Sequence, residues 1–510
     1  MTEDGGRPPL RIVSHPVPGV TPTPAPRESV AAAADLLRPS AATERLRLPG
    51  ALAVTTGQQP GLFGGPMYVV HKALAARAVA RCLERHWDRP VVPVFWLAGD
   101  DHDFAEATRT AWWTRADEVV EWRLPPRADD APQHPMAAEP LPIRDVAAAR
   151  ERLAADLAPG AARDHALAWI DRHWRAGATI HSAFATAIAE LLEPLGIAML
   201  DATAAPMKRA QVRLLLDAVD RSSVLDHALA HLPERDAWVG AGEGHTLVFV
   251  EAAAGRDRLV RDGDAFRTRR SGERFTRDEL AALLQREPER FSANVLLRPV
   301  VEAALLPTAA YVAGPGELRY LTRQAAALYP LLDVEPQAPL PRWGGSVIDA
   351  VSERLLGRLA LDANAVLDDR GALGRMMVRR DLDGRVPAAI EELQAAIDAT
   401  AATLQEAGTA IDPVLARAIE SRRRKLRFVT EDLERLMERH HKKRDGIAWS
   451  QFRRLRTRLL PLDQRQERTI GVAAALGTWG EEWITAAAKA ADAWAEATVV
   501  PSLATAGDSR

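Results

Sequence analysis

The sequence predicts an α/β protein with a parallel-sheet core, followed by a C-terminal antiparallel helical hairpin. Residues 50–125 show strand, loop, helix and strand patterns in succession, which together indicate a βαβ unit. The run VVPVFWLA at 91–98 is apolar at every position, as expected for a parallel strand that helices cover on both faces. Beyond about residue 375, apolar residues recur at spacings of three and four, which favours packed helices.

Length and composition are those of an ordinary multidomain globular protein. The 510 residues exceed what one hydrophobic core usually supports, so two or three domains are expected. Hydrophobic residues make up 47% and charged residues 26% of the chain, which is typical of soluble proteins. The formal net charge of −3 provides no general field for nucleic acid or acidic membranes. We therefore expect no nucleic-acid partner.

The chain shows no targeting or membrane signal. No stretch approaches the roughly 18 uninterrupted apolar residues of a membrane span, and the start MTEDGGRPPL lacks the pattern of a secretory signal. The one cysteine, Cys82, cannot form an intrachain disulfide. Its place among Ala and Val favours a buried structural thiol over a nucleophile. We expect a cytoplasmic protein with no membrane partner.

The N-terminal half of the predicted core follows an extended segment. Residues 1–49 are predicted as an extended arm with a first helix, because HPVPGVTPTPAP at 15–26 is too rich in proline for regular structure. The core itself is predicted over 50–375. It begins with the apolar run ALAVTT as a strand, and residues 66–86 then show helical spacing, with Pro66 acceptable in a first turn.

Two segments are predicted as insertions in this core. A helical insertion covers about 126–195, since residues 144–195 are rich in alanine. A β-rich insertion covers about 235–290, where TLVFVEA and RLVRDGDAFRTRR form a two-stranded pattern with an Asp-Gly turn. Further strands of the core are expected at 196–201 and 309–314.

The C-terminal region, residues 376–510, is predicted as a helical coiled-coil domain. Heptad-like seams joined by AGTAIDP predict an antiparallel hairpin at about 386–440. The basic run at 422–425 is typical of a solvated helix face, with a phosphate-binding patch as the alternative. A third helix is expected at 449–460. Because an exposed hairpin usually buries its apolar stripe against another chain, we expect a homodimer.

The candidate site lies where three loops are expected to meet. In open α/β sheets, ligands bind beyond the carboxyl ends of the strands, and loops 56–66, 98–104 and 313–317 occupy that position. The first loop is rich in glycine but matches neither phosphate-binding fingerprint, so a simple tight turn is the alternative. Gln58 and Gln59 favour binding, because their amides offer both donors and acceptors.

The helix after the first loop begins with two further candidates, His71 and Lys72. Both lie within two turns of the helix start, where free N–H groups favour anions. They are therefore candidates for binding a carboxylate or a phosphate. A solvated Lys72 is the alternative.

An acidic sequence follows the buried strand at 91–98. Asp101 and His102 stand at the carboxyl end of that strand, where a carboxylate and an imidazole are natural general-base or amine-anchoring groups. Asp103 and Glu106 also fit a D-x-x-E capping box. Asp and His are competent metal ligands, but four consecutive residues cannot all face one ion. No tightly bound metal is therefore predicted.

The third loop, GPGELRY, exposes backbone at Gly314 and Gly316. Glu317 and Tyr320 begin the helix that follows it. The chain has only four tyrosines, and Tyr68 and Tyr320 both lie at glycine-bearing helix starts. This clustering favours a role at the crevice over simple core filling.

Taken in order, these stretches resemble the bacillithiol-biosynthesis cysteine-adding enzymes. The resemblance rests on TGQQPGLFGGPMYVVHKA, VPVFWLAGDDHDFAE, PERFSANVLLRPVVEAALLPTAAYVAGPGELRY and a C-terminal helical hairpin, and it covers roughly residues 50–475. It implies a Rossmann-like core with inserted connecting segments and a coiled coil that mediates dimerisation. It also implies a ligase that joins L-cysteine to the amine of glucosaminyl-malate, with ATP or ADP and Mg²⁺ as the expected cofactors.

The resemblance also implies the residues of the site. The predicted catalytic residues are Asp101, His102 and His71. The predicted substrate-binding residues are Gln58, Gln59, Tyr68, Lys72, Asp103, Asn294, Arg298, Gly314, Gly316, Glu317 and Tyr320. Arg298 suits the carboxylates of malate through a bidentate fork, and the Asp101–His102 pair is assigned to the attacking amine. The chain departs from the family pattern at Arg109 or Thr110, where a histidine is usual.

Two other classes of function are open at this point. The chain is a candidate for a non-catalytic dimeric nucleotide- or metabolite-binding protein in which the hairpin is the functional part. It is also a candidate for a metal-dependent hydrolase that uses the acidic sequence. The convergence of polar residues from three loops favours the ligase, because a binding scaffold needs no such group.

Overall fold

The computed structural model describes residues 10–17, 19, 23–233, 239–240, 244–381, 384–442 and 446–507. The chain forms two compact units. The larger unit consists of Leu10–Val347 and the C-terminal segment from Gln466, and the smaller unit is Ile348–Arg465. This division corrects the predicted boundary at 375/376. Residues 466–507, which were predicted as part of the helical domain, belong to the larger unit, because their apolar faces pack on its core.

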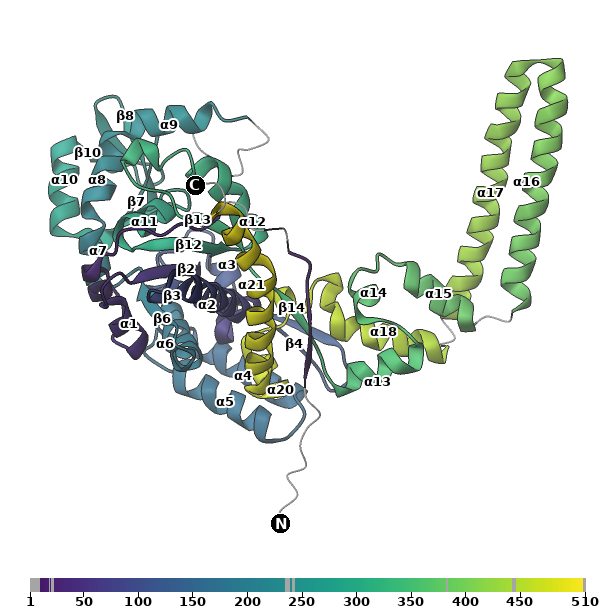
Figure 1. The fold of residues 1–510 in the computed structure, drawn as a ribbon, viewed down its shortest axis with the longest axis horizontal. Coiled ribbons are helices and arrows are strands. Elements are labelled where there is room, and N and C mark those ends of the chain that lie inside the picture. The colour runs from purple at the N-terminus through teal and green to yellow at the C-terminus, as the bar shows by residue number, and fades with distance from the viewer. Residues whose placement is uncertain are drawn as a thin grey trace, which may run out of the picture. The chain divides into compact units, whose positions relative to one another are not determined.

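The larger unit is built on a five-stranded sheet with the order β13-β12-β2-β3-β6. All four strand pairings are parallel. Its strands are β2 (Leu52–Gln58), β3 (Val91–Leu97), β6 (Ala198–Asp201), β12 (Thr308–Ala313) and β13 (Ala338–Pro341). Neighbouring strands β2 and β3 are joined by α2 (Tyr68–Trp87), so the predicted βαβ unit is confirmed (Figure 1).

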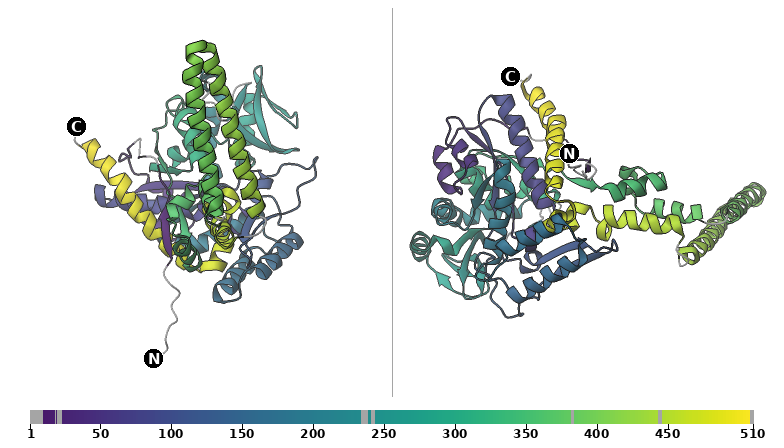
Figure 2. Two further views of the ribbon diagram at one scale, coloured as in Figure 1. Left: turned by 90° about the vertical axis from the view of Figure 1, so that its right-hand side faces the viewer. Right: turned by 90° about the horizontal axis from the view of Figure 1, so that it is seen from below.

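Both faces of this sheet are buried, which explains why strand β3 is apolar throughout. Phe95 and Leu97 belong to one hydrophobic cluster, whereas Val94 and Trp96 belong to a second one. Alternate side chains of a strand point to opposite faces, so the two clusters lie on the two sides of the sheet. Helix α21 (Glu482–Gly507) packs along α2 (Figure 2).

The insertions differ in detail from their predictions. The region predicted as helical, 126–195, contains α4 (Ile143–Asp156), α5 (Ala161–His173) and α6 (Ile180–Leu192), and its first 17 residues are not helical. The two-stranded β pattern is part of a five-stranded antiparallel sheet with the order β10-β9-β8-β7-β11. Residues 235–238 and 241–243 of the predicted β-rich insertion lie outside the described residues.

The strands outside the parallel sheet are β1 (Arg11–Ser14), β4 (Arg109–Trp113), β5 (Val119–Arg123), β7 (His245–Ala252), β8 (Gly255–Asp262), β9 (Ala265–Thr268), β10 (Arg274–Phe275), β11 (Phe291–Ala293) and β14 (Gly345–Ile348). The other helices of the larger unit are α1 (Ala41–Leu46), α3 (Phe104–Ala107), α7 (Ala205–Ala210), α8 (Val212–Asp220), α9 (Ser222–Ala230), α10 (Arg277–Arg286), α11 (Arg298–Leu305), α12 (Pro315–Tyr320), α19 (Gln466–Thr469) and α20 (Val472–Trp479). The predicted arm forms neither helix nor strand over residues 23–30, and positions 18 and 20–22 lie outside the described residues.

The smaller unit is helical and contains the predicted hairpin. Its helices are α13 (Ala350–Leu359), α14 (Ala363–Leu367), α15 (Ala372–Asp381), α16 (Arg385–Ile411), α17 (Pro413–Lys442) and α18 (Ile447–Leu459). Helices α16 and α17 lie side by side and run in opposite directions (Figures 1 and 2). The predicted third helix is α18, which packs on α13 and α15. Arg423 of the basic run pairs with Glu420 and Asp398, as expected for an arginine on the surface of a helix.

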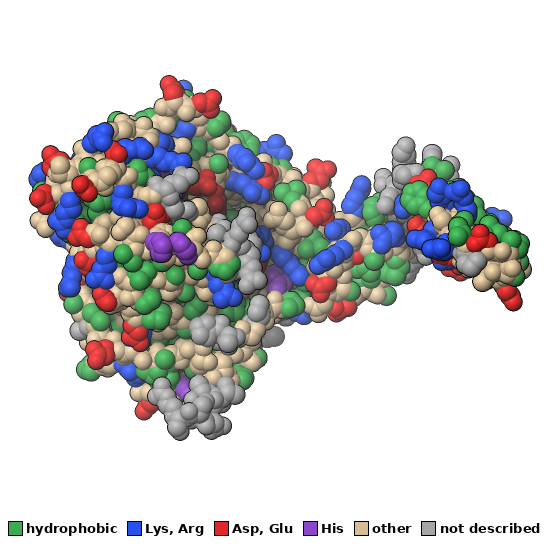
Figure 3. All heavy atoms as spheres, turned by 90° about the horizontal axis from the view of Figure 1, so that it is seen from above, with side chains coloured by type: hydrophobic (Ala, Val, Ile, Leu, Met, Phe, Trp, Pro, Cys, Tyr) green, Lys and Arg blue, Asp and Glu red, His purple; other side chains and the backbone are tan. Residues whose placement is uncertain are grey.

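Surface charge and hydropathy agree with the composition. On the face drawn in Figure 3, basic and acidic side chains are interspersed over the larger unit, and hydrophobic side chains show on the hairpin. Within the described ranges, no helix combines the length and the apolar character that a membrane crossing requires.

Cys82 is buried on α2, as predicted, and is expected to resist modification. Cys82 is 2% exposed. Burial and the nearby charge of Glu496 raise the pKa of its thiol to about 12. Because the thiolate is the nucleophile, we expect iodoacetamide at pH 8 to leave the folded protein unmodified and to alkylate the unfolded chain fully. Mass spectrometry of both samples measures this, and rapid labelling of the folded protein would contradict it.

Candidate functional site

A polar cavity of about 370 Å³ opens at the carboxyl ends of the parallel strands. Its lining includes residues that end or directly follow β2, β3, β12 and β13, so the three predicted loops meet here with a fourth. The lining residues are Gly57, Gln58, Gln59, Tyr68, Lys72, Ala98, Asp101, Glu106, Val295, Arg298, Gly314, Pro315, Gly316, Glu317, Tyr320, Arg342 and Arg468. We refer to this cavity as the cleft.

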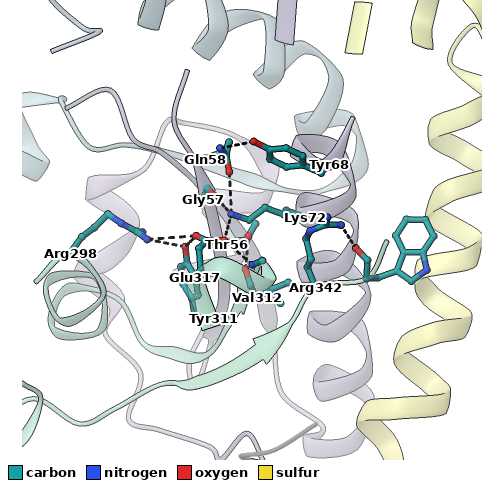
Figure 4. Close-up of polar contacts among 12 residues, drawn as sticks. Thr56, Gly57, Gln58, Tyr68, Lys72, Arg298, Tyr311, Val312, Glu317 and Arg342 are labelled. Carbon is teal, nitrogen blue, oxygen red and sulfur yellow. Dashed lines mark hydrogen bonds and ion pairs between the residues drawn. The ribbon is translucent and has the colours of Figure 1, made fainter. Parts of the chain in front are cut away.

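A buried ion pair joins two sides of the cleft. Lys72 is 1% exposed, and its Nζ donates to Glu317 Oε2 at 2.7 Å, to Gln58 Oε1 at 3.3 Å and to the carbonyl of Gly57 (Figure 4). The alternative of a solvated Lys72 is therefore wrong. Burial lowers the pKa of Lys72, and the charge of Glu317 partly restores it. Burial also disfavours ionisation of Glu317, but Lys72 and Arg298 outweigh this effect and lower its pKa.

Arg298 links this pair to a second buried carboxyl group. Its guanidinium donates to Tyr311 Oη at 3.0 Å, and that hydroxyl donates to Glu317 Oε1 at 2.9 Å (Figure 4). Arg298 also contacts Glu302 Oε2 at 3.5 Å, while Thr55 donates to the other oxygen of Glu302. Burial raises the pKa of Glu302 to about 7, against the opposing charge of Arg298. Tyr311 and Glu302 thus set the orientation of the Arg298 guanidinium.

The glutamine loop contributes a second polar group on the opposite side. Gln58 Nε2 donates to Tyr68 Oη at 3.3 Å, and Tyr68 Oη lies 3.5 Å from Glu106 Oε1. Gln59 lines the cleft beside Glu106. The glycines that follow serve the turn itself, because Gly64 has a φ of +89° and a side chain there would clash with Val472.

His71 does not reach the cleft, which corrects its prediction as a catalytic residue there. It is 1% exposed, and its Nδ1 lies 2.8 Å from Glu467 Oε2. Glu467 accepts in turn from Arg342 Nη2 at 2.5 Å and from the amide of Gly345 at 3.0 Å. Burial opposes ionisation of Glu467, but hydrogen bonds from His15 and His71 and the charge of Arg342 hold its pKa well below the usual range. His71 therefore helps to place Arg342.

His102 and Asn294 line an adjoining cavity of about 250 Å³, which shares Asp101 and Arg298 with the cleft. The His102 ring nitrogen Nδ1 lies 3.1 Å from Arg256 Nη1. Burial and the charge of Arg256 lower the pKa of His102. Asn294 Oδ1 accepts from two backbone amides that open α11.

The acidic sequence separates into different local roles. Asp103 lines neither cavity and caps α3, since its Oδ1 accepts from the Glu106 amide at 3.0 Å. Asp100 pairs with Lys208 at 2.6 Å, and Asp101 accepts from the amides of His102 and Asp103. In the part of the chain that the structure describes, no group of three His, Cys, Asp or Glu side chains has metal-binding geometry.

Three residues of the cleft were missed as functional candidates in the sequence. Arg342 directly follows β13, so the same strand-end rule that identified Gly314 could have found it. Glu106 was assigned only to a helix cap. Arg468 lies on α19, far along the chain from every loop of the crevice, and no local pattern marked it.

A parallel sheet with a polar cavity at its carboxyl edge defines a Rossmann-like protein with a small-molecule site. Two family models match the chain in agreement with this class. The N-terminal Rossmann-like domain of bacillithiol biosynthesis BshC matches residues 33–342, and the C-terminal coiled-coil domain of BshC matches residues 346–498. The chain belongs to the BshC family.

Curated relatives extend over most of the chain. A protein of Koribacter versatilis is 31% identical over 90% of this chain and 85% of its own length. A protein of Salinibacter ruber is 31% identical, covering 84% of this chain and 79% of its own length. A protein of Solibacter usitatus is 29% identical over 88% of this chain and 84% of its own length. Each carries the name "Putative cysteine ligase BshC".

Proposed function

We propose that this protein is a cysteine ligase that joins L-cysteine to the amine of glucosaminyl-malate in bacillithiol biosynthesis. The observation that carries the proposal is the charge pattern of the cleft. Arg298, Arg342 and Arg468 line it together with Asp101 and Glu106. Such a site suits partners that carry both carboxylates and an amine, because each charge finds an opposite one. The relatives' printed name, "Putative cysteine ligase BshC", supports a cysteine ligase.

The roles of individual residues follow from their places in this proposal. Arg298 is already aligned by Tyr311 and Glu302 and binds a carboxylate of the acidic sugar conjugate. Asp101 faces both cavities and binds the acceptor amine. Arg342, held by Glu467, binds a second anionic group. Lys72 and Glu317 keep the floor of the cleft in place.

We propose that ATP with Mg²⁺ activates the carboxylate. Amide formation from a free carboxylate needs an activated acyl group, and a phosphate or adenylate ester provides one. The cationic side chains of the cleft suit a polyphosphate as well as a carboxylate. This cofactor assignment is independent of the substrate assignment and is tested separately below.

The test is mass spectrometry of the purified protein incubated with cysteine and glucosaminyl-malate, with and without ATP and Mg²⁺. We expect the cysteinyl amide only when ATP is present. Product without ATP would overturn the cofactor proposal and keep the ligase. No product in any condition from folded protein would favour the non-catalytic binding function.

We also propose that the hairpin mediates a homodimer. Its exposed apolar side chains include Leu426 (53% exposed) and Leu433 (45% exposed) on α17, and such a stripe is stabilised when a second chain covers it. We expect Leu426→Glu to shift the protein from dimer to monomer in size-exclusion chromatography with light scattering. Val224→Glu, at a side chain 51% exposed on α9, is the matched control and should remain dimeric. A monomeric parent protein would contradict the proposal.

A further inference from the structure

Amide formation releases a proton from the attacking amine, and the cleft must offer a group that accepts it. Two groups that line the cleft or the adjoining cavity are already in ion pairs, since Lys72 pairs with Glu317 and Asp100 pairs with Lys208 at 2.6 Å. The other carboxyl and imidazole side chains of the two linings are those of Glu317, Asp101, His102 and Glu106. A general base has to face the substrate and have a lone pair that no strong donor occupies. The four groups differ clearly by these criteria.

Glu317 is the least suitable of them. Lys72 and the amide of Gly314 both donate to its Oε2 at 2.7 Å, and Tyr311 donates to its Oε1 at 2.9 Å. These donors and the charge of Arg298 lower its pKa in spite of burial. Protonation of Glu317 would break its buried ion pair with Lys72. Glu317 therefore maintains this ion pair and does not act as the base for the amine.

Asp101 and His102 are also occupied. Asp101 Oδ1 accepts from the amides of His102 and Asp103 at 2.7 Å and 3.2 Å, so two backbone donors already occupy this oxygen. His102 lies in the adjoining cavity with its Nδ1 at 3.1 Å from Arg256 Nη1. The neighbouring guanidinium disfavours a second positive charge on the ring. His102 therefore has little capacity to hold the released proton.

Glu106 meets both criteria. Its carboxylate lines the cleft, lies 3.5 Å from Tyr68 Oη and stands beside the side chain of Gln59, and both of these neighbours are uncharged. Burial and the nearby charges of Asp103 and Asp101 raise its pKa, which makes it a stronger base than an ordinary glutamate.

We propose that Glu106 is the general base of amide formation, with the uncharged side chains of Tyr68 and Gln59 beside its carboxylate. The amine nitrogen attacks the acyl carbon of a carboxyl group activated as an acyl phosphate or acyl adenylate. The C–N bond forms, the C–O bond to the phosphate or nucleotide breaks, and the amine proton moves to Glu106 Oε. This inference rests on the proposed ligase function.

The test compares steady-state kinetics and pH profiles of the parent protein, Glu106→Gln, Glu106→Asp and Glu118→Gln. Glu106→Gln keeps the size and hydrogen bonds of the side chain but cannot accept a proton. We expect kcat to fall about 100-fold or more, the range for loss of a general base, with KM nearly unchanged. Glu106→Asp should recover part of kcat, and Glu118→Gln, at an exposed site on the turn between β4 and β5, should match the parent.

The pH profile separates catalysis from a structural role. In the parent, kcat/KM should fall as the pH drops through the raised pKa of Glu106, because the base becomes protonated. This acid limb should disappear in Glu106→Gln. If Glu106→Gln keeps kcat within threefold, or if His102→Gln loses activity while Glu106→Gln does not, the inference is overturned and the ligase function stands. If the parent protein forms no product, the proposed ligase function and the inference about Glu106 fail together.

Discussion

Lys72→Met should abolish turnover and lower the free energy of unfolding by about 3 kcal/mol, the scale measured when one partner of a buried ion pair is removed. Lys72 is 1% exposed and pairs with Glu317 at 2.7 Å. Without the ammonium, Glu317 would keep its contacts with Tyr311, Arg298 and the amide of Gly314 but would lose its ion pair at 2.7 Å. The carbonyl of Gly57 would also lose a donor. Guanidinium denaturation measures the change in the free energy of unfolding, and product formation measures the loss of turnover.

The double variant Lys72→Met with Glu317→Gln separates stability from activity. Removing both charges should restore part of the lost stability, since an uncharged pair carries no unpaired buried ion. Activity should stay lost, because the floor that orients Gln58 and Arg298 would be gone. A Lys72→Met variant with parental stability and turnover would show that the pair contributes neither to folding nor to the cleft.

Glu467→Gln should also strongly lower the free energy of unfolding, and the size of this loss should depend on pH. The carboxylate holds Arg342 at 2.5 Å, His71 at 2.8 Å and the amide of Gly345 at 3.0 Å within the larger unit. At pH 7 we expect a loss of about 3 kcal/mol in the free energy of unfolding, as for other broken buried pairs. We also expect weaker substrate binding, seen as a raised KM, because Arg342 would lose its anchor in the cleft.

The sign of the pH dependence follows from the lowered pKa of Glu467 in the folded protein. The stabilisation is present above the unfolded-state value of about 4.3 and is lost as the pH falls from there through the folded pKa. The stability difference between the parent and Glu467→Gln should therefore narrow below about pH 4.3. Glu481→Gln, at a side chain 64% exposed in the same segment, is the control and should change stability by less than about 1 kcal/mol. A difference that stayed constant down to pH 3 would contradict this account.

Local patterns were sufficient to predict much of the fold and the position of the site. The uninterrupted apolar run at 91–98 indicated a strand covered on both faces, and the two clusters that divide Phe95 from Trp96 show why. The rule that ligands bind at the carboxyl ends of parallel strands brought Gln58, Asp101 and Gly314 to one cleft, as observed.

The remaining features depend on contacts that no local pattern reports. The partner of His71 is Glu467, 396 residues further along the chain, so the helix position of His71 gave no sign that it is buried away from the cleft. The role of His102 depends on Arg256, which comes from the antiparallel sheet. The sequence placed α20 and α21 in the helical domain because their apolar residues have helical spacing whichever unit they pack on.

The smaller unit leaves and rejoins the larger one at a single place. The amide of Val347 donates to Gln466 Oε1 at 2.8 Å, and Gln466 Nε2 lies 3.2 Å from the carbonyl of Val347. Ile348–Arg465 is therefore an inserted domain, because the residues that flank it, Val347 and Gln466, are hydrogen-bonded to each other. A short glycine linker in its place would leave the strands and helices of the larger unit uninterrupted. Arg468 would still line the cleft, and Glu467 would still hold Arg342. The proposed ligase site lies in the larger unit and the proposed dimer hairpin lies in the smaller unit, so the two proposals concern separable parts of one polypeptide.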